Sequence, residues 1–171
     1  MKNTIFLCVF VMLIAGCNST KKIGKHPDYK ITGLFNGTCK TGAITSEKLE
    51  VSPTGKVGLF GTMNLVEKTD TIKANLGSTY CFIYKIEGKS SDAKSTNSLI
   101  EVEQTWIPPK PIVNTAGKSF PEISYKIEQI VGGETPTSYT FEEKYEIVKG
   151  VWVFQVGFEG VILYKKQFYL E

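Results

Sequence analysis

The chain has 171 residues and a formal net charge of +3, and its 42% apolar and 22% charged residues are typical of one soluble globular domain. All 20 basic residues are lysines and His26 is the single histidine, which argues against guanidinium recognition of phosphate, Ser-His-Asp catalysis and multi-histidine metal sites. The composition therefore predicts no catalytic, metal-binding or cofactor-binding residues, and it gives no support for nucleic-acid binding.

The first 16 residues are typical of the signal peptide of a bacterial lipoprotein. The apolar run from Ile5 to Ala15 is too short, at about 11 residues, to cross a hydrocarbon core of about 30 Å as a helix. The residues from Leu13 to Cys17 resemble the lipobox, the motif whose cysteine thiol receives a diacylglyceryl group. We therefore expect residues 1–16 to be removed and Cys17 to be lipidated; an ordinary signal peptide or an uncleaved anchor is the alternative.

Residues 17–28 lack an apolar period and contain Pro27, so they are expected to form a flexible tether between the anchor and the domain, residues 29–171. Two or three acyl chains on Cys17 would hold the protein stably on a membrane. The next residue is Asn18, and because an aspartate there retains enteric lipoproteins at the inner membrane, the sequence favours the outer membrane and its periplasmic face. The expected partners are this membrane and an unknown protein or glycan.

From residue 29 onward, apolar and polar residues alternate with a period of two, which predicts β-strands rather than helices. In chain order, the expected strands cover residues 29–35, 48–51, 57–66, 71–75, 80–86, 100–106, 122–131, 138–147, 152–158 and 161–170, and the first four are the weaker ones. Glu159 and Gly160 are expected to form the turn of the C-terminal hairpin. Of these ten ranges, about eight or nine are expected to form strands, and that number of short strands without crossover helices predicts an immunoglobulin-like antiparallel β-sandwich, with a closed β-barrel as the alternative.

The glycine-rich run from Gly55 to Thr62 reads Gly-Lys-Val-Gly-Leu-Phe-Gly-Thr and could suggest a phosphate-binding loop. Such a loop, however, requires Gly-Lys-Ser or Gly-Lys-Thr at the start of a helix. Because this run lies in a strand-like region, we expect a hairpin turn or a β-bulge here instead.

Two pairs of glutamates share predicted strand faces, Glu101 with Glu103 and Glu142 with Glu146. Glycoside hydrolases need two carboxylates about 5 to 9.5 Å apart in a cleft. Both pairs lie on the polar face of an alternating strand, interleaved with Thr105 or Lys144. A solvated, charged exterior is therefore the expected role of these residues.

Cys39 and Cys81 are the two thiols that would remain in the mature chain, since Cys8 leaves with the signal peptide and Cys17 is acylated. In an oxidising compartment they could form a disulfide, which would stabilise the fold by about 4 kcal/mol in the chain-entropy model. Two free, buried thiols are the alternative, because the sequence does not show whether the two Cβ atoms approach each other.

Turn glycines and aromatic residues follow one another in a distinctive order. The motifs are Gly33-Leu34-Phe35, Thr71 to Ser78 before the aromatic strand Tyr80 to Tyr84, Trp106-Ile107-Pro108-Pro109, and Phe141 and Tyr145 before Gly150 to Phe154 and Phe168. This order resembles the uncharacterised bacterial family called domain of unknown function 3859, over nearly all of residues 29–171. The chain departs from the family pattern before Gly150, where a proline is usual, and at Cys81, where a glycine is common. The resemblance implies no reaction, and the departure at Cys81 favours a disulfide there.

Trp106 and the prolines that follow it are the strongest candidates for a contact surface. Three aromatic residues of the strand 152–158 share one face and are expected in the core, whereas Trp106 ends a strand beside Pro108 and Pro109 and could form an exposed rim. A loop packed on the core is the competing interpretation. With so few catalytic side chains, the sequence predicts a non-catalytic binding or structural module; an envelope hydrolase using Glu and Lys, or a carrier of a small apolar ligand, are the alternatives.

Overall fold

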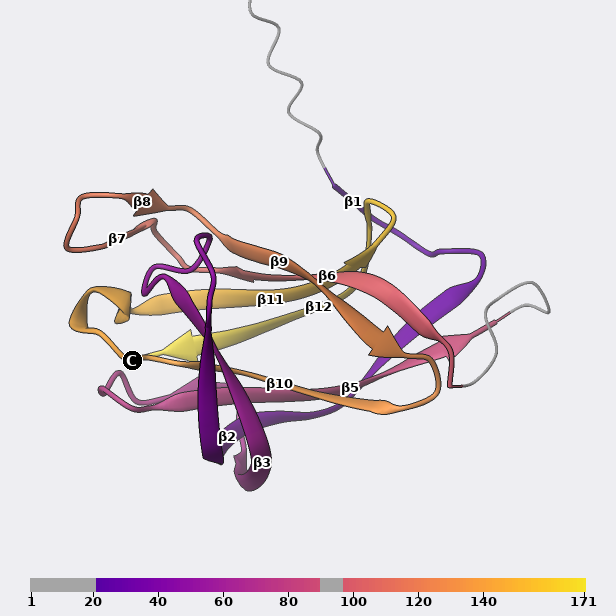
Figure 1. Cartoon of the computed structure of the whole chain (residues 1–171), viewed down its shortest axis with the longest axis horizontal. Helices are drawn as coiled ribbons and strands as arrows, with labels where there is room; N and C mark the ends of the chain where they lie inside the picture. The colour runs from indigo at the N-terminus through magenta and orange to yellow at the C-terminus, as the bar shows by residue number, and fades with distance from the viewer. Residues whose placement is uncertain (1–20, 90–96) are drawn as a thin grey trace, which may run out of the picture.

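The computed structural model describes residues 21–89 and 97–171, without the side chains of residues 43, 44, 59 and 60. The predicted antiparallel β-sandwich is confirmed, and Figure 1 shows its two layers from the side. Both main sheets are open, so the alternative of a closed barrel is wrong. Within the described residues, no helix combines the length and the hydrophobicity needed to cross a membrane.

One main sheet has the strand order β1-β12-β11-β6-β9, with β4 also paired to β12, and the other has the order β10-β5-β2-β3. Strands β7 and β8 form a separate hairpin. The elements of the described residues are β1 Lys22–Ile23, β2 Tyr29–Lys48, β3 Lys56–Lys68, β4 Thr71–Ile72, β5 Thr79–Gly88, β6 Leu99–Ile107, β7 Ile112–Val113, β8 Ser119–Phe120, β9 Ile123–Ile130, β10 Glu134–Thr140, the 3₁₀ helix η1 Lys144–Glu146, β11 Gly150–Phe158 and β12 Val161–Leu170.

The alternation of apolar and polar residues gives each central strand one face in the core. From β5, Tyr80 and Phe82 point between the sheets and meet aromatic rings of the opposite layer. The ring centroids of Phe82 and Phe154 are 4.5 Å apart, and those of Tyr80 and Phe168 are 4.0 Å apart. The space between the sheets is therefore packed with rings, which disfavours the apolar cavity that a lipid or small-ligand carrier would need.

The prediction of a contact surface at Trp106 is wrong. Trp106 is 1% exposed and packs against Phe82 and Phe154, at centroid distances of 5.7 and 4.6 Å. The reason is that β6 is a central strand, paired with β11 on one side and β9 on the other, and Trp106 lies on the strand face that points to the second sheet. Pro108 is also buried, and of the three residues only Pro109 is exposed.

The expected strand over residues 138–147 ends at Thr140, where the chain turns a corner and forms η1. The corner is built around the carboxylate of Glu146, which is 2% exposed. Its Oε2 accepts hydrogen bonds from the backbone N–H groups of Glu142 and Glu143, both at 2.9 Å, and its Oε1 accepts one from the hydroxyl of Tyr139 at 2.7 Å. Glu146 is thus a buried structural group, which corrects its expected place on a solvated strand face.

Residues 17–28 are expected to form a flexible tether, but the part of them that the structure describes, residues 21–28, is folded against the domain. Lys22–Ile23 form β1, which pairs in parallel with β12, and the N–H of Gly24 donates to the carbonyl of Ile162 at 3.2 Å. The buried ring of His26 packs against Phe158, with the centroids 5.0 Å apart. Residues 21–28 therefore belong to the folded domain. The predicted signal peptide, residues 1–16, and the lipidation site Cys17 lie outside the described residues.

Candidate functional site

Strand β2 changes its partner halfway along its length. Residues 29–38 pair with β5, whereas residues 37–48 pair with β3. Residues 39–65, which we call the arm, therefore leave the second sheet as a two-stranded ribbon. Figure 1 shows the arm, in dark purple, crossing the side of the sandwich where β9 and β10 are the edge strands of the two sheets.

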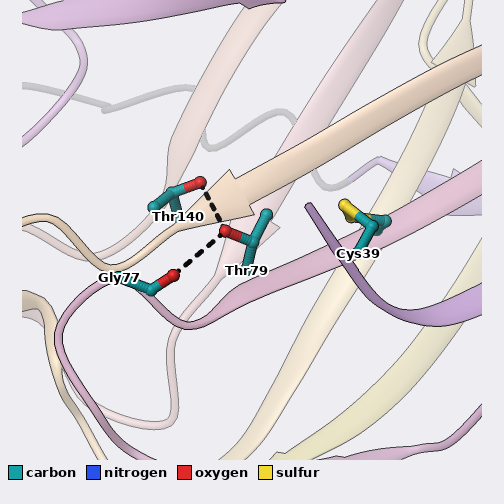
Figure 2. Close-up of a disulfide and its surroundings, with 5 residues drawn as sticks. Cys39, Gly77, Thr79 and Thr140 are labelled. Carbon is teal, nitrogen blue, oxygen red and sulfur yellow. Dashed lines mark hydrogen bonds between the residues drawn. A yellow bond between two sulfur atoms is a disulfide. The ribbon is translucent and has the colours of Figure 1, made fainter. Parts of the chain in front are cut away.

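The base of the arm is fixed by a disulfide and by close backbone packing. Cys39 and Cys81 form a disulfide with a Cα–Cα distance of 6.0 Å, which joins the first residue of the arm to β5. Figure 2 shows Cys39 beside β5, in the neighbourhood of the 2.9 Å hydrogen bond between the hydroxyls of Thr79 and Thr140. A β-bulge lies between Thr38 and Cys39, and a Cβ on Gly37 would collide with the carbonyl of Glu67. The chain therefore turns into the arm at a tightly constrained point.

The tip of the arm is held by η1 and by the hairpin of β7 and β8. The hydroxyl of Tyr145 and the amide of Asn114 donate to the carbonyl of Pro53 at 3.3 and 3.4 Å, and the ammonium of Lys118 donates to the carbonyl of Glu50 at 3.0 Å. The tip is a turn in which Gly55 has a φ of +75°, a value that glycine adopts without strain. The glycine-rich run is therefore a turn followed by a strand, as expected, and not a phosphate-binding loop.

A groove of about 550 Å³ lies between the arm and the open side of the sandwich. We call it the arm groove. Its lining comprises residues 47–49 and 57–58 of the arm, residues 125–127 and 129 of β9, residues 135–138 of β10, and Gln104. Two strand edges and a ribbon thus border one space, which is large enough to take part of a ligand.

The floor of the arm groove is a hydrogen-bonded polar network centred on Gln104, which is 1% exposed. Its Nε2 donates to the hydroxyl of Tyr84 at 2.8 Å, and its Oε1 accepts from the hydroxyls of Tyr125 at 3.1 Å and Thr137 at 2.9 Å. Amide and hydroxyl groups carry no charge at physiological pH, and burial raises the pKa of the Tyr84 hydroxyl further above its usual value. The floor is therefore preorganised, uncharged and rich in amide and hydroxyl groups.

A smaller hollow of about 260 Å³ lies between the arm and the corner after β10. It contains Lys56, Glu142 and Glu146 among serine and threonine hydroxyls. Lys56 and Glu142 form an ion pair at 3.1 Å, which raises the pKa of Lys56, and burial raises the pKa of Glu146. Because Glu146 already accepts three hydrogen bonds from the protein, this carboxylate pair ties the corner and the arm together rather than facing a substrate.

The second pair of glutamates lies on the surface, as expected. Glu101 pairs with Lys126 at 2.7 Å, and Glu103 pairs with Lys21 at 2.6 Å. Partial burial acts to raise the pKa of Glu103, but hydrogen bonds from Lys21 and Ser124 outweigh it and hold the pKa below its usual value. In residues 21–89 and 97–171, no three His, Cys, Asp or Glu side chains come together in a way that could hold a metal ion.

Sequence reasoning missed both the arm and the polar floor. The one local signal of the floor is Gln104, a polar residue on a strand face whose neighbours at a spacing of two are Val102 and Trp106. A polar residue on an otherwise apolar face is buried only with hydrogen-bond partners. The partners come from β5, β9 and β10, which no local pattern brings together.

Comparison with solved structures supports the immunoglobulin-like fold. An immunoglobulin-like protein from Pseudomonas aeruginosa superposes with a TM-score of 0.55 and 20% sequence identity, covering 86% of this chain and all of that one. An alkylpurine DNA glycosylase from Pseudomonas fluorescens, bound to DNA containing an abasic site analog, has a TM-score of 0.40 and 14% identity over 60% of this chain and 28% of its own. At that TM-score the second likeness says nothing about this chain.

No curated protein is a significant match to the sequence. A family model matches residues 52–170, from the tip of the arm to the end of β12, and agrees with the resemblance that the motifs suggested. This match covers more than two thirds of the 171 residues. The chain therefore belongs to the family described as domain of unknown function (DUF3859).

Proposed function

We propose that this protein is a non-catalytic binding module of the cell envelope, anchored through a lipid on Cys17, and that its ligand binds in the arm groove. The observation that carries the proposal is the arm itself. A ribbon fixed at its base by a disulfide and at its tip by three hydrogen bonds spans the open side of the sandwich, and it leaves a groove beneath it.

Several features of the groove favour binding over catalysis. Its floor is neutral, and each polar group of Gln104 is already oriented by a neighbour, which lowers the cost of ordering the site when a ligand binds. The glutamates of the smaller hollow are engaged by Lys56, Tyr139 and backbone N–H groups. A hydrolase would need a carboxylate that is free to meet the substrate.

The position of the first described residues is compatible with a membrane anchor. The chain enters the fold at β1, which pairs with β12 at one edge of the first sheet, and the ammonium of Lys21 pairs with Glu103 of β6. The groove is bounded by the opposite edge of the same sheet, at β9. A lipid on Cys17 would thus hold the protein by one edge and leave the arm groove accessible from the other.

Photo-cross-linking in cells tests the proposal directly. p-Benzoylphenylalanine is placed at Lys48 or at Pro136, two exposed residues that line the arm groove, and at Thr62, an exposed residue of β3 outside it. We expect a discrete adduct from the two groove positions and none from Thr62. If the groove positions give no adduct, or if Thr62 gives the same one, the groove is not the binding site.

A further inference from the structure

We infer that the arm groove accepts an extended polypeptide segment, which adds as a strand to the free edge of β9. This inference rests on the proposed function, because it names the class of ligand that the groove takes. It is carried by three observations: the direction of the backbone groups in β9, the way the groove meets the strand edges, and the chemistry of its lining.

The backbone of β9 has one satisfied side and one open side. The N–H of Val131 donates to the carbonyl of Ser98 at 2.9 Å, in line with the β6–β9 register. Hydrogen-bonding residues alternate along an antiparallel strand, so the odd-numbered residues of β9 point their N–H and C=O groups at β6. Those of Lys126 and Glu128 point the other way, where β9 has no partner strand among the described residues.

The groove runs along strand edges rather than over a strand face. Successive side chains of a strand point to opposite faces, yet residues 125, 126 and 127 of β9 all line the groove. Residues 135 to 138 of β10 do the same. A space that contacts side chains from both faces of a strand lies against the edge of that strand. The backbone N–H and C=O groups of Lys126, which have no partner strand in the described part of the chain, lie at this edge.

The edge of β10 is a poorer template for an added strand. The N–H of Phe141 donates to the carbonyl of Ser78 at 3.0 Å, and the same alternation directs the backbone of Pro136 away from β5, toward the groove. Proline has no N–H to donate, so β10 lacks a hydrogen-bond donor at the middle of the groove. β9 contains no proline, and it is therefore the edge that we assign to the ligand.

The lining matches a peptide better than a glycan. Sugar rings are usually stacked on an exposed aromatic face, and the aromatic side chain of this lining, Tyr125, has its hydroxyl engaged by Gln104. Leu49, Val57 and Ile127 offer apolar contacts to alternate side chains of an extended segment. The ammonium of Lys126 is already paired with Glu101, so main-chain hydrogen bonds rather than charge would supply the affinity.

Strand addition is tested with a peptide probe and two proline variants. The full chain in detergent micelles is used to select binders from a random nonapeptide library on phage, and the best sequence is synthesised. Glu128→Pro removes an N–H on the open side of β9, between the groove residues Ile127 and Gln129, and it removes no hydrogen bond to β6. Thr62→Pro is the matched control, because it changes an exposed residue of another edge strand, β3, outside the groove.

We expect Glu128→Pro to weaken peptide binding about tenfold or more, the effect of losing one hydrogen bond to a desolvated group, and Thr62→Pro to leave it unchanged. In the wild type, the peptide should slow hydrogen exchange at the amides of Lys126 and Glu128. This second measurement decides the matter if Glu128→Pro does not fold.

The inference is overturned if no peptide is selected, if Glu128→Pro binds as tightly as the wild type, or if the two amides exchange at an unchanged rate. Failure of the proposed function looks different, because then the groove positions Lys48 and Pro136 give no cross-linked adduct in cells. An adduct with a glycan from those positions would keep the binding function and reject the peptide.

Discussion

Removing the disulfide between Cys39 and Cys81 should destabilise the fold by an amount that the loop length sets. The two cysteines are separated by 42 positions, and in the chain-entropy model closing such a loop lowers the entropy of the unfolded chain by about 13 cal/mol/K, or about 4 kcal/mol at 25 °C. For a chain of this size, each kcal/mol corresponds to about 2 to 4 °C in melting temperature. We therefore expect a decrease of about 8 to 16 °C.

The measurement compares thermal unfolding of the oxidised wild type with that of the reduced and refolded wild type. The protein is reduced in urea, because Cys81 is completely buried and its disulfide reacts poorly in the native state. The double variant Cys39→Ser, Cys81→Ser is the control, and its melting temperature should not respond to reductant. The reasoning is refuted if the reduced and oxidised wild type unfold within about 1 kcal/mol of each other, or if both thiols are freely alkylated in protein taken from cells.

Three further predictions concern the anchor, the core and the buried carboxylate. An alkynyl fatty acid supplied to cells should label the wild type and leave Cys17→Ala unlabelled and soluble; a labelled variant would contradict lipidation at Cys17. Trp106→Ala should lower the free energy of unfolding by about 3 to 5 kcal/mol, because it leaves a cavity in the aromatic core. Urea denaturation measures this change, and a decrease below about 1 kcal/mol would mean that Trp106 is not packed as described. Burial raises the pKa of the Glu146 carboxyl in the folded state, so the folded protein binds the carboxyl proton more tightly than the unfolded chain does. Protonation of Glu146 therefore stabilises the fold below a pH of about 4.5, and this stabilisation is lost as the pH rises through the raised pKa. Glu146→Gln should lack this part of the pH dependence, and parallel stability curves for the two proteins would count against it.

The strands that the sequence predicts well are those whose pattern is continuous and whose turn is local. The hairpin of β11 and β12 is an example, because the inward residues Trp152, Phe154 and Val156 of β11 alternate with less buried ones and its turn needs two residues with positive φ. Glu159 and Gly160 have φ values of 49° and 78°, as a two-residue hairpin turn requires. Such features depend on neighbours in the chain and can be derived from the sequence alone.

The arm could not be predicted because its defining feature is a change of partner. Within β2, the alternation is broken by glycines at Gly33, Gly37 and Gly42, so the pattern supports a strand only as far as Phe35. In the structure the strand continues to Lys48 because β3 replaces β5 as its neighbour. Which strand pairs with which is decided by contacts far apart in the chain, and no period of two records it.

The two wrong expectations about Trp106 and Glu146 have the same origin. Prolines after Trp106 indicated the end of a strand, but the position of β6 between two neighbours puts the ring in the core. The alternation through Glu146 indicated an exposed face, but hydrogen bonds from Tyr139 and from two backbone N–H groups bend the chain into a corner. In both cases tertiary contacts outweighed a correct local pattern.

The central claim, that ligand binds in the arm groove, is tested most directly by blocking that groove and measuring the cross-linked adduct. Glu47 is an exposed arm residue that lines the arm groove and not the smaller hollow, and Glu47→Trp would add a large ring on the strand face that it shares with Leu49 and Val57. The adduct from p-benzoylphenylalanine at Pro136 is quantified in cells with and without this substitution, at equal protein level and melting temperature. We predict that the adduct disappears in the Glu47→Trp protein; an undiminished adduct would contradict binding in the arm groove.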